Sequence, residues 1–218
     1  RVDNRKKLDF LNEGRGVKIK KFIKDSGLGV GDISNMLSGS GKNLDQAIDM
    51  LISNQKSLQI IARESALSMD NISALLTESG VSIGNNIRDI QTRAKDIKSF
   101  VDNTGFSASS ISNVLNGAGK KVGECLDILL LNTDKLNILM NDTNLSSSNI
   151  SSMLGNSGKE LEKAIKGLVS GKNKIIDITK RGIFSPQNIA VMLKDSGKNI
   201  KEGISDFAAR QEKLEKYI

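Results

Sequence analysis

The chain has 218 residues and a net charge of +7, and it contains no His, no Trp and a single Cys. Without His the commonest general base and metal ligand is missing, and one Cys forms neither an internal disulfide nor a cysteine-rich zinc site. We therefore expect no enzyme activity, no metal and no cofactor, and an intracellular, reducing location. No apolar run reaches the about 18 residues of a membrane span. Because the chain opens on Arg1 instead of Met, we expect a fragment of a longer protein.

One pattern recurs five times at a constant spacing. It reads LGVGDISNML from residue 28, LSMDNISALL from residue 67, FSASSISNVL from residue 106, LSSSNISSML from residue 145 and FSPQNIAVML from residue 184, each start 39 residues after the one before. Such a period is typical of solenoids, in which each unit buries its apolar face against its neighbours. We therefore predict an all-α fold, a right-handed α-solenoid (superhelix) of 39-residue helix–loop–helix repeats. Repeat positions are counted from these five starts.

In chain order, the predicted units form one continuous array. They are a degenerate, partial and basic N-terminal repeat (residues 1–27), four full repeats (28–66, 67–105, 106–144 and 145–183) and a truncated fifth repeat (184–218). The first unit is interpreted as a back half because Ile19 and Phe22 fall on the positions of Leu58 and Ile61. Its nine Lys or Arg against four acidic residues make it net +5. It is either a sequence-independent DNA anchor or a solubilising cap of the array.

Within a repeat, positions 3 to 11 are predicted to form a first helix. Position 6 is always Ile, position 10 is always Leu and position 9 is always apolar, which is one face of a helix. Ser at position 2 of four repeats is a good N-cap, and Pro186 follows such a Ser at the first helical position. A Gly at position 14 of every repeat is expected to end this helix with a tight turn.

A second apolar series at positions 17, 21 and 24 predicts a second helix, and an apolar pair follows at positions 31 and 34. Residues Ser53-Asn54 and Ser170-Gly171 indicate breaks between the two series. Either the second helix bends there or a third helix starts. Position 20 is mostly small, as close packing requires, with Asn86 as the exception. Cys125 at this position is therefore predicted to be a core residue and not a nucleophile.

The loops before the second helix read SGSGK, TESGV, NGAGK, GNSGK and KDSGK, with Lys after the Gly in four of the five. A nucleotide-binding P-loop is excluded, because Asn43 stands where Ser or Thr must follow the Lys and Met36 stands where the first Gly is needed. The residues just before the Gly vary while the core positions do not. Such variation is what a modular reader of a linear polymer would show.

The segments FSPQNIAVMLKDSGKNIKEGI and LSSSNISSMLGNSGKELEKAI resemble repeats of the transcription-activator-like effectors (TALEs), and most of all the TALE-like proteins of bacterial endosymbionts. The resemblance covers nearly the whole chain. It implies that each repeat reads one base of duplex DNA from the major groove through a pair of loop residues. The first residue of the pair would brace the loop and the second would face the base. The Gly and the residue after it would hold a phosphate.

Carried onto this chain, the resemblance places phosphate contacts at Gly41, Lys42, Gly80, Gly119, Lys120, Gly158, Lys159, Gly197 and Lys198, with Val81 lacking the cation. The base-facing pairs are Gly39-Ser40, Glu78-Ser79, Gly117-Ala118, Asn156-Ser157 and Asp195-Ser196. This chain has one Gly where the family has two, and its repeat is longer. A register shifted back by one therefore stays open, with the pairs Ser38-Gly39, Thr77-Glu78, Asn116-Gly117, Gly155-Asn156 and Lys194-Asp195. Short side chains at the base-facing positions predict weak sequence specificity.

The physical chemistry of the loop agrees with an anion-binding role. N–H groups at a helix start attract anions, and a neighbouring Lys adds charge, so repeated loops could follow a phosphate backbone. The expected partner is double-stranded DNA, bound by a monomer in the cytoplasm or nucleoid, or in a host nucleus if the protein is a secreted effector. The alternative is a protein-binding solenoid that grips a host protein, with the Lys residues merely solvated. Single-stranded RNA is disfavoured because the loops lack aromatic and Arg stacking groups.

Overall fold

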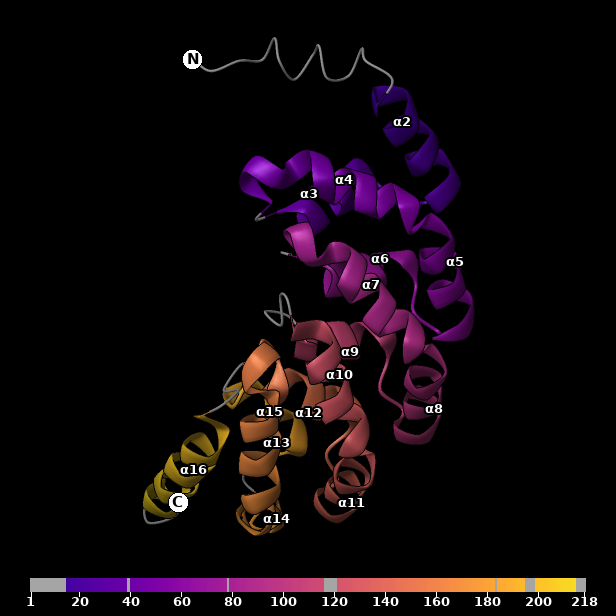
Figure 1. Cartoon of the computed structure of the whole chain (residues 1–218). Helices are drawn as coiled ribbons and strands as arrows, with labels where there is room; N and C mark the ends of the chain where they lie inside the picture. Colours follow the sequence, from indigo (N-terminus) through magenta and orange to yellow (C-terminus); the bar gives the residue numbers. More distant parts are fainter. Residues whose placement is uncertain are drawn as a thin grey trace, which may run out of the picture.

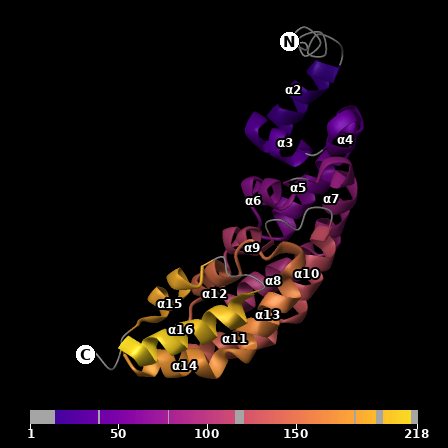
Figure 2. The ribbon, with the colours of Figure 1, turned by 90° about the vertical axis from the view of Figure 1, so that its left-hand side faces the viewer.

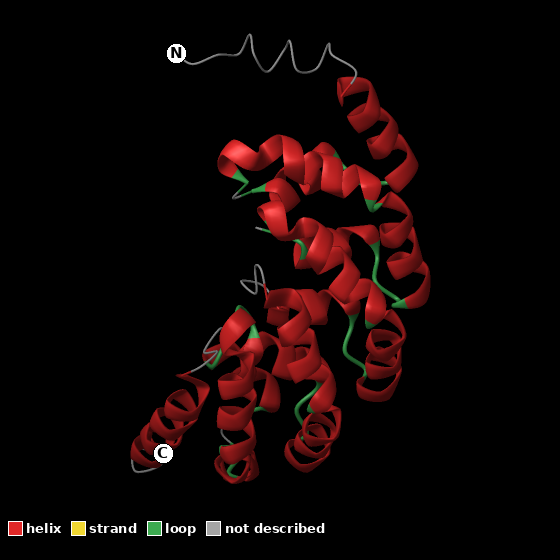
Figure 3. Cartoon of the chain, in the orientation of Figure 1, coloured by secondary structure: helices red, strands yellow, loops and turns green. Residues whose placement is uncertain are grey.

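The computed structural model describes residues 15–38, 40–77, 79–115, 121–182, 184–194 and 199–214. These residues form fifteen α-helices and short 3-10 turns, and none of them lies in a strand (Figure 3). The expected all-α fold is confirmed.

The first helix of each repeat starts at the predicted cap. Ser68 Oγ accepts a hydrogen bond from the N–H of Asn71 at 3.2 Å, and Ser107, Ser146 and Ser185 cap their helices in the same way. The predicted serine caps are therefore confirmed. These helices start 39 residues apart: α3 (Val30–Leu37), α6 (Met69–Leu75), α9 (Ala108–Leu115), α12 (Ser147–Leu154) and α15 (Pro186–Met192). Those of repeats 1, 2, 4 and 5 end one or two residues earlier than expected.

The recurrent Gly does not end the first helix, contrary to the sequence-based expectation. α3 stops at Leu37, and Gly41 instead starts a separate 3-10 turn with a φ of 53°. An L-residue with a side chain rarely adopts this left-handed φ, which explains why Gly recurs there. The described turns of this kind are η1 (Gly41–Asn43), η2 (Gly80–Ser82) and η4 (Gly158–Glu160).

The second apolar series forms a helix of ten residues in four repeats, and a third helix follows. The two meet at position 27, where Asn54, Arg93, Asn132 and Gly171 adopt similar φ values of −94°, −102°, −103° and −84°. Of the two alternatives that the sequence left open, a bent second helix or a third helix, the structure therefore shows the third helix. The second helices are α4 (Leu44–Ser53), α7 (Ile83–Thr92), α10 (Val122–Leu131), α13 (Leu161–Ser170) and the unbroken α16 (Ile200–Leu214). The third helices are α5 (Gln55–Glu64), α8 (Ala94–Thr104), α11 (Thr133–Thr143) and α14 (Lys172–Lys180), and α2 (Arg15–Ser26) precedes them all.

Equivalent helices of successive repeats pack side by side in three rows, which are called files below. The first file is α3, α6, α9, α12 and α15, the second is α4, α7, α10, α13 and α16, and the third is α2, α5, α8, α11 and α14. Figures 1 and 2 show the files following one curve. The N-terminal ends of α4, α7 and α10 lie on its inner edge (left in Figure 1), and α5 and α8 lie on its outer edge.

The predicted core positions are buried. Every Ile at position 6 and every Leu at position 10 is at most 8% exposed, and Cys125 is 1% exposed, as expected of a core residue. Leu44 is the exception among the second-helix core positions, with 43% of its surface exposed.

In repeats 1 to 3 a buried hydroxyl at position 38 connects the third helix to the next repeat, which the sequence analysis did not foresee; Gly182 stands at this position in repeat 4. Thr104 Oγ1 donates to the carbonyl of Phe100 at 2.7 Å and accepts from the N–H of Phe106 at 3.2 Å. Ser65 and Thr143 make the same two bonds in their repeats. The hydroxyl thereby satisfies a carbonyl of the last helical turn and fixes where the next repeat begins.

Candidate nucleic-acid interface

The loops of repeats 1, 2 and 4 share one backbone geometry. In the first, the N–H of Ser40 bonds the carbonyl of Leu37 at 3.1 Å, and the N–H of Asn43 bonds the carbonyl of Ser40 at 3.0 Å. The loops of Ser79 and Ser157 repeat both bonds. The recurrent Gly has a positive φ in all three, at Gly41, Gly80 and Gly158. Loops that differ in sequence therefore share one backbone conformation at the position-13 Ser and the Gly that follows it.

The Ser at position 13 points into the protein in these loops. Ser40, Ser79 and Ser157 are 5%, 0% and 5% exposed. The hydroxyls of Ser40 and Ser157 donate to the carbonyls of Leu37 and Leu154 at 2.6 Å and 2.5 Å. Ser79 Oγ accepts from Asn86 Nδ2 at 2.8 Å. A buried hydroxyl that is engaged in this way braces the loop and offers no group to a base.

The burial of these three Ser residues disfavours the register that turns them toward bases, and it is compatible with the register shifted back by one. In that register position 12 is the outer residue. Asn156 occupies it in repeat 4, where its side chain is exposed, its φ is 58° and its N–H bonds the carbonyl of Asn113 in the preceding repeat at 3.0 Å. The other residues of the predicted base-facing pairs lie outside the described residues: Gly39, Glu78, Gly117, Ala118, Asp195 and Ser196.

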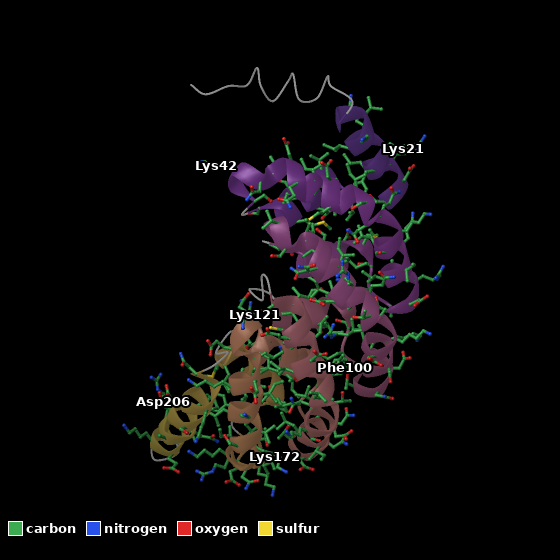
Figure 4. All side chains as sticks on the ribbon, in the orientation of Figure 1. Lys21, Lys42, Phe100, Lys121, Lys172 and Asp206 are labelled. Atoms are coloured by element: carbon green, nitrogen blue, oxygen red, sulfur yellow. The ribbon has the colours of Figure 1, made fainter. Side chains whose placement is uncertain are left out.

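The structure describes only some of the predicted phosphate ligands. Lys42 is exposed in η1, whereas Val81 is half-buried at the equivalent place in η2. The structure does not describe Gly119, Lys120, Gly197, Lys198 or the side chain of Lys159. Figure 4 shows Lys42 and Lys121 on the inner edge of the curve, where the loops lie.

Lys121 is a further cation beside the third loop. It follows Lys120 directly and was not among the predicted phosphate ligands. Its Nζ lies 3.0 Å from Oε2 of Glu124 on the first turn of α10. The hydrogen bond to Glu124 raises the pKa of Lys121 above its usual value. Lys121 is thus held beside the loop in its charged form, with one acidic partner.

Serine hydroxyls at position 7 hold neighbouring first helices in register, and with them the loops. Ser73, Ser112 and Ser151 are 2%, 7% and 4% exposed. Each donates to a carbonyl at position 5 of the preceding repeat, at 3.4 Å, 3.2 Å and 3.1 Å. Because such a bond has a defined length and direction, it sets how far one loop is displaced from the next.

The outer face of the first helices is nearly uncharged. None of the five contains Lys or Arg, and their acidic residues are Asp32 and Asp70. Exposed amides and hydroxyls cover them, among them Asn35, Ser109, Asn113, Ser148 and Gln187. Any attraction for a polyanion must therefore come from the loops and from charges outside the first helices.

No group of three or more His, Cys, Asp or Glu side chains that could hold a metal was found among the described residues. Burial raises the pKa of the Cys125 thiol to about 11, and its Sγ donates to the carbonyl of Gly158 at 3.2 Å. A thiol of this kind is not a nucleophile near neutral pH. In the same part of the chain, no helix is both long and apolar enough to cross a membrane.

Comparisons of the chain with protein-family models, with curated proteins and with solved structures found no match.

Proposed function

We propose that the protein is a double-stranded DNA-binding, TALE-like right-handed α-solenoid whose loops follow the major groove. The observation that carries this proposal is the recurrence of one loop geometry along the inner edge of a curved array. A duplex is itself a regular polymer, so a reader of duplex DNA needs equivalent contacts at equal steps. Helix starts 39 residues apart and the ladder of serine bonds supply those steps.

In this proposal each loop position has a different role. The buried Ser at position 13 braces the loop, and position 12 faces the base edges. The Gly and the cation of the following turn lie beside phosphates, where Lys42 supplies charge in repeat 1 and Val81 leaves repeat 2 without it. Position 12 is Gly39, Glu78, Gly117, Asn156 and Asp195 in the five repeats. Because the two Gly residues have no side chain to contact a base, specificity is expected to be weak.

A protein-binding solenoid is the second candidate, and the first helices, which contain no Lys or Arg and few acidic residues, favour it. Exposed amides and hydroxyls suit the N–H and C=O groups of a polypeptide better than a phosphate. In this case the lysines of the loops would serve solubility, and their removal would leave partner binding unchanged.

The two candidates are separated by one titration with a matched control. A fluorescent duplex is titrated with the wild type, with a loop variant (Lys42, Lys120, Lys159 and Lys198 to Ala) and with a control variant (Lys56, Lys95, Lys135 and Lys174 to Ala). The control removes the same charge from exposed positions on the third helices. If four phosphate contacts are lost, the plot of log affinity against log salt concentration becomes less steep by about 3.6, and this happens in the loop variant alone.

Two results would contradict DNA binding. One is a wild type that does not bind duplex DNA at low salt. The other is a loop variant and a control variant that weaken binding equally, which would mean that only net charge matters.

A further inference from the structure

The helix α2 carries more positive charge than any other helix of the third file. Its exposed lysines stand against one acidic residue, Asp25, and they are Lys18, Lys20, Lys21 and Lys24. Val17 on the same helix leaves 67% of its surface exposed. The helix therefore offers both positive charge and an aliphatic side chain to its surroundings.

The valine and three of the lysines share one face of α2. They follow one another three or four positions apart, which places them side by side on a helix: Val17, Lys20, Lys21 and Lys24. The other face holds Phe22, which is buried, and Ile19 and Ile23, which pack against the core. Because that face is fixed by packing, the lysines are held outward around Val17.

Acidic partners balance the lysines of other helices in this file. Lys98 Nζ lies 2.8 Å from Oδ2 of Asp102 within α8, and Lys172 Nζ of α14 lies 2.6 Å from Oδ2 of Asp142 in α11. Among the residues that the structure describes, no such ion pair holds the four lysines of α2. Their charge is therefore available to an external anion.

The lysines of α2 face away from the loops. Figure 4 shows Lys21 on the outer edge of the curve and Lys42 on the inner edge. The helix α4 runs from one edge to the other (Figure 1), and its ten residues span about 15 Å. This is longer than the screening length of about 8 Å at physiological ionic strength. A polymer that follows the inner edge therefore makes little use of the charge on α2.

We propose that the outward face of α2 docks on an anionic lipid bilayer. The negative potential of such a surface attracts lysines, and each lysine near it strengthens binding about fivefold. Val17 enters the boundary between headgroups and acyl chains, as apolar side chains of basic interfacial helices do. A nucleic acid would also attract the lysines, but it offers no apolar environment to Val17.

The contact is peripheral and needs no helix that crosses the bilayer. It leaves the inner edge of the array free, because the two surfaces lie on opposite edges. The inference therefore holds whether the loops bind DNA or protein.

The first test measures sedimentation of the full-length chain with vesicles. One set contains phosphatidylserine and phosphatidylcholine in equal parts, and the other contains phosphatidylcholine alone. The α2 variant replaces Lys18, Lys20, Lys21 and Lys24 by Gln. A matched control replaces the same number of exposed lysines on other third helices by Gln: Lys95, Lys135, Lys174 and Lys180. We expect binding to anionic vesicles only, weakened about a hundredfold or more in the α2 variant and at most a few-fold in the control.

The second test asks whether Val17 itself reaches the bilayer. Since the chain contains no Trp, Val17→Trp introduces a single fluorescent reporter on α2. Leu131→Trp on α10, where Leu131 is 83% exposed, is the control. With anionic vesicles, the emission of the first variant should shift to shorter wavelength and become protected from acrylamide quenching. The emission of the control should not change.

Four results would overturn the proposal. The wild type could fail to bind anionic vesicles at low salt. The α2 variant and the control could bind them equally, which would leave α2 as a solubilising cap. The emission of Val17→Trp could stay unchanged on bound protein, which would assign binding to another surface. In a duplex titration, a loss confined to the α2 variant would assign its lysines to nucleic acid. Circular dichroism of every variant checks that the array is still folded.

Discussion

Asn86 donates a hydrogen bond from Nδ2 to Oγ of Ser79 at 2.8 Å, and both side chains are buried. This bond explains why a polar amide stands at position 20 of the second repeat, where the other repeats have small residues. The hydroxyl of Ser79 accepts from the helix behind the loop, whereas Ser40 and Ser157 donate to a carbonyl three residues back.

We predict that Ser79→Ala destabilises the protein more than Asn86→Ala does. Ser79→Ala takes the acceptor from a buried amide, which costs about 1–3 kcal/mol. In Asn86→Ala the Ser79 hydroxyl can turn to the carbonyl of Leu76, as its equivalents do, so part of the loss is recovered. Urea unfolding of both single variants and the double variant measures the coupling. Effects that add to within about 0.5 kcal/mol would show that the two side chains act independently.

Ala66 occupies a left-handed backbone position that its equivalents fill with better-suited residues. Its φ is 61°, and the same place holds Gly27 and Gly105 with φ values of 74° and 67° and Asn144 with 57°. We predict that Ala66→Gly raises the free energy of unfolding by about 1 kcal/mol and that Gly105→Ala lowers it by a similar amount. No atom crowds a Cβ at Gly105 more closely than 4.0 Å, so the backbone alone is tested. Urea unfolding should give changes in the free energy of unfolding of opposite sign for the two variants. Changes of the same sign would contradict the explanation.

The helices and their apolar faces could be predicted because a constant period makes each repeat an independent copy of the same pattern. Ile at position 6, Leu at position 10 and Ser at position 2 each have one physical role that their spacing reveals. The third helix could not be predicted, because Asn54, Arg93, Asn132 and Gly171 share a backbone conformation and no chemical property.

The loop register could not be predicted because Ser is compatible with both an outward and a buried position. A short hydroxyl can face solvent or bond a carbonyl three residues back, as Ser40 and Ser157 do. The available signal was that position 13 holds only Ser or Ala while position 12 varies freely. Restriction to small residues indicates packing, and variation indicates exposure.

Gly167 marks a close approach between the second helices of repeats 4 and 5. A Cβ there would lie 2.8 Å from Cγ2 of Ile200 and 3.3 Å from the backbone N of Lys201. Gly31 in α3 is exposed and has no atom within 4 Å of such a Cβ. Both Gly→Ala changes gain helix propensity, about 1 kcal/mol. We predict that only Gly167→Ala also strains the junction, so that the two free energies of unfolding differ by about 1–3 kcal/mol. Equal values in urea unfolding would mean that the junction relaxes without cost.

Arg93 and Asp127 form a two-pronged ion pair between repeats 2 and 3. Arg93 Nε and one terminal nitrogen lie 2.6 Å and 2.7 Å from the two carboxylate oxygens. The hydrogen bond from Arg93 holds the pKa of Asp127 below its usual range. A carboxylate with a lowered folded pKa stabilises the protein above its unfolded pKa, and this stabilisation is lost as the pH falls through the folded pKa.

We therefore predict that Asp127→Asn is less stable than the wild type near neutral pH and equally stable in acid below the lowered pKa. Because the Asp127 side chain is 50% exposed, the difference should be on the order of 1 kcal/mol or less. Urea unfolding of both proteins across this pH range measures it. In an Arg93→Ala background the same substitution should have no pH-dependent effect, since the group that lowers the pKa is gone. A difference that persists in acid, or that survives Arg93→Ala, would assign the effect of Asp127 to packing and not to the ion pair.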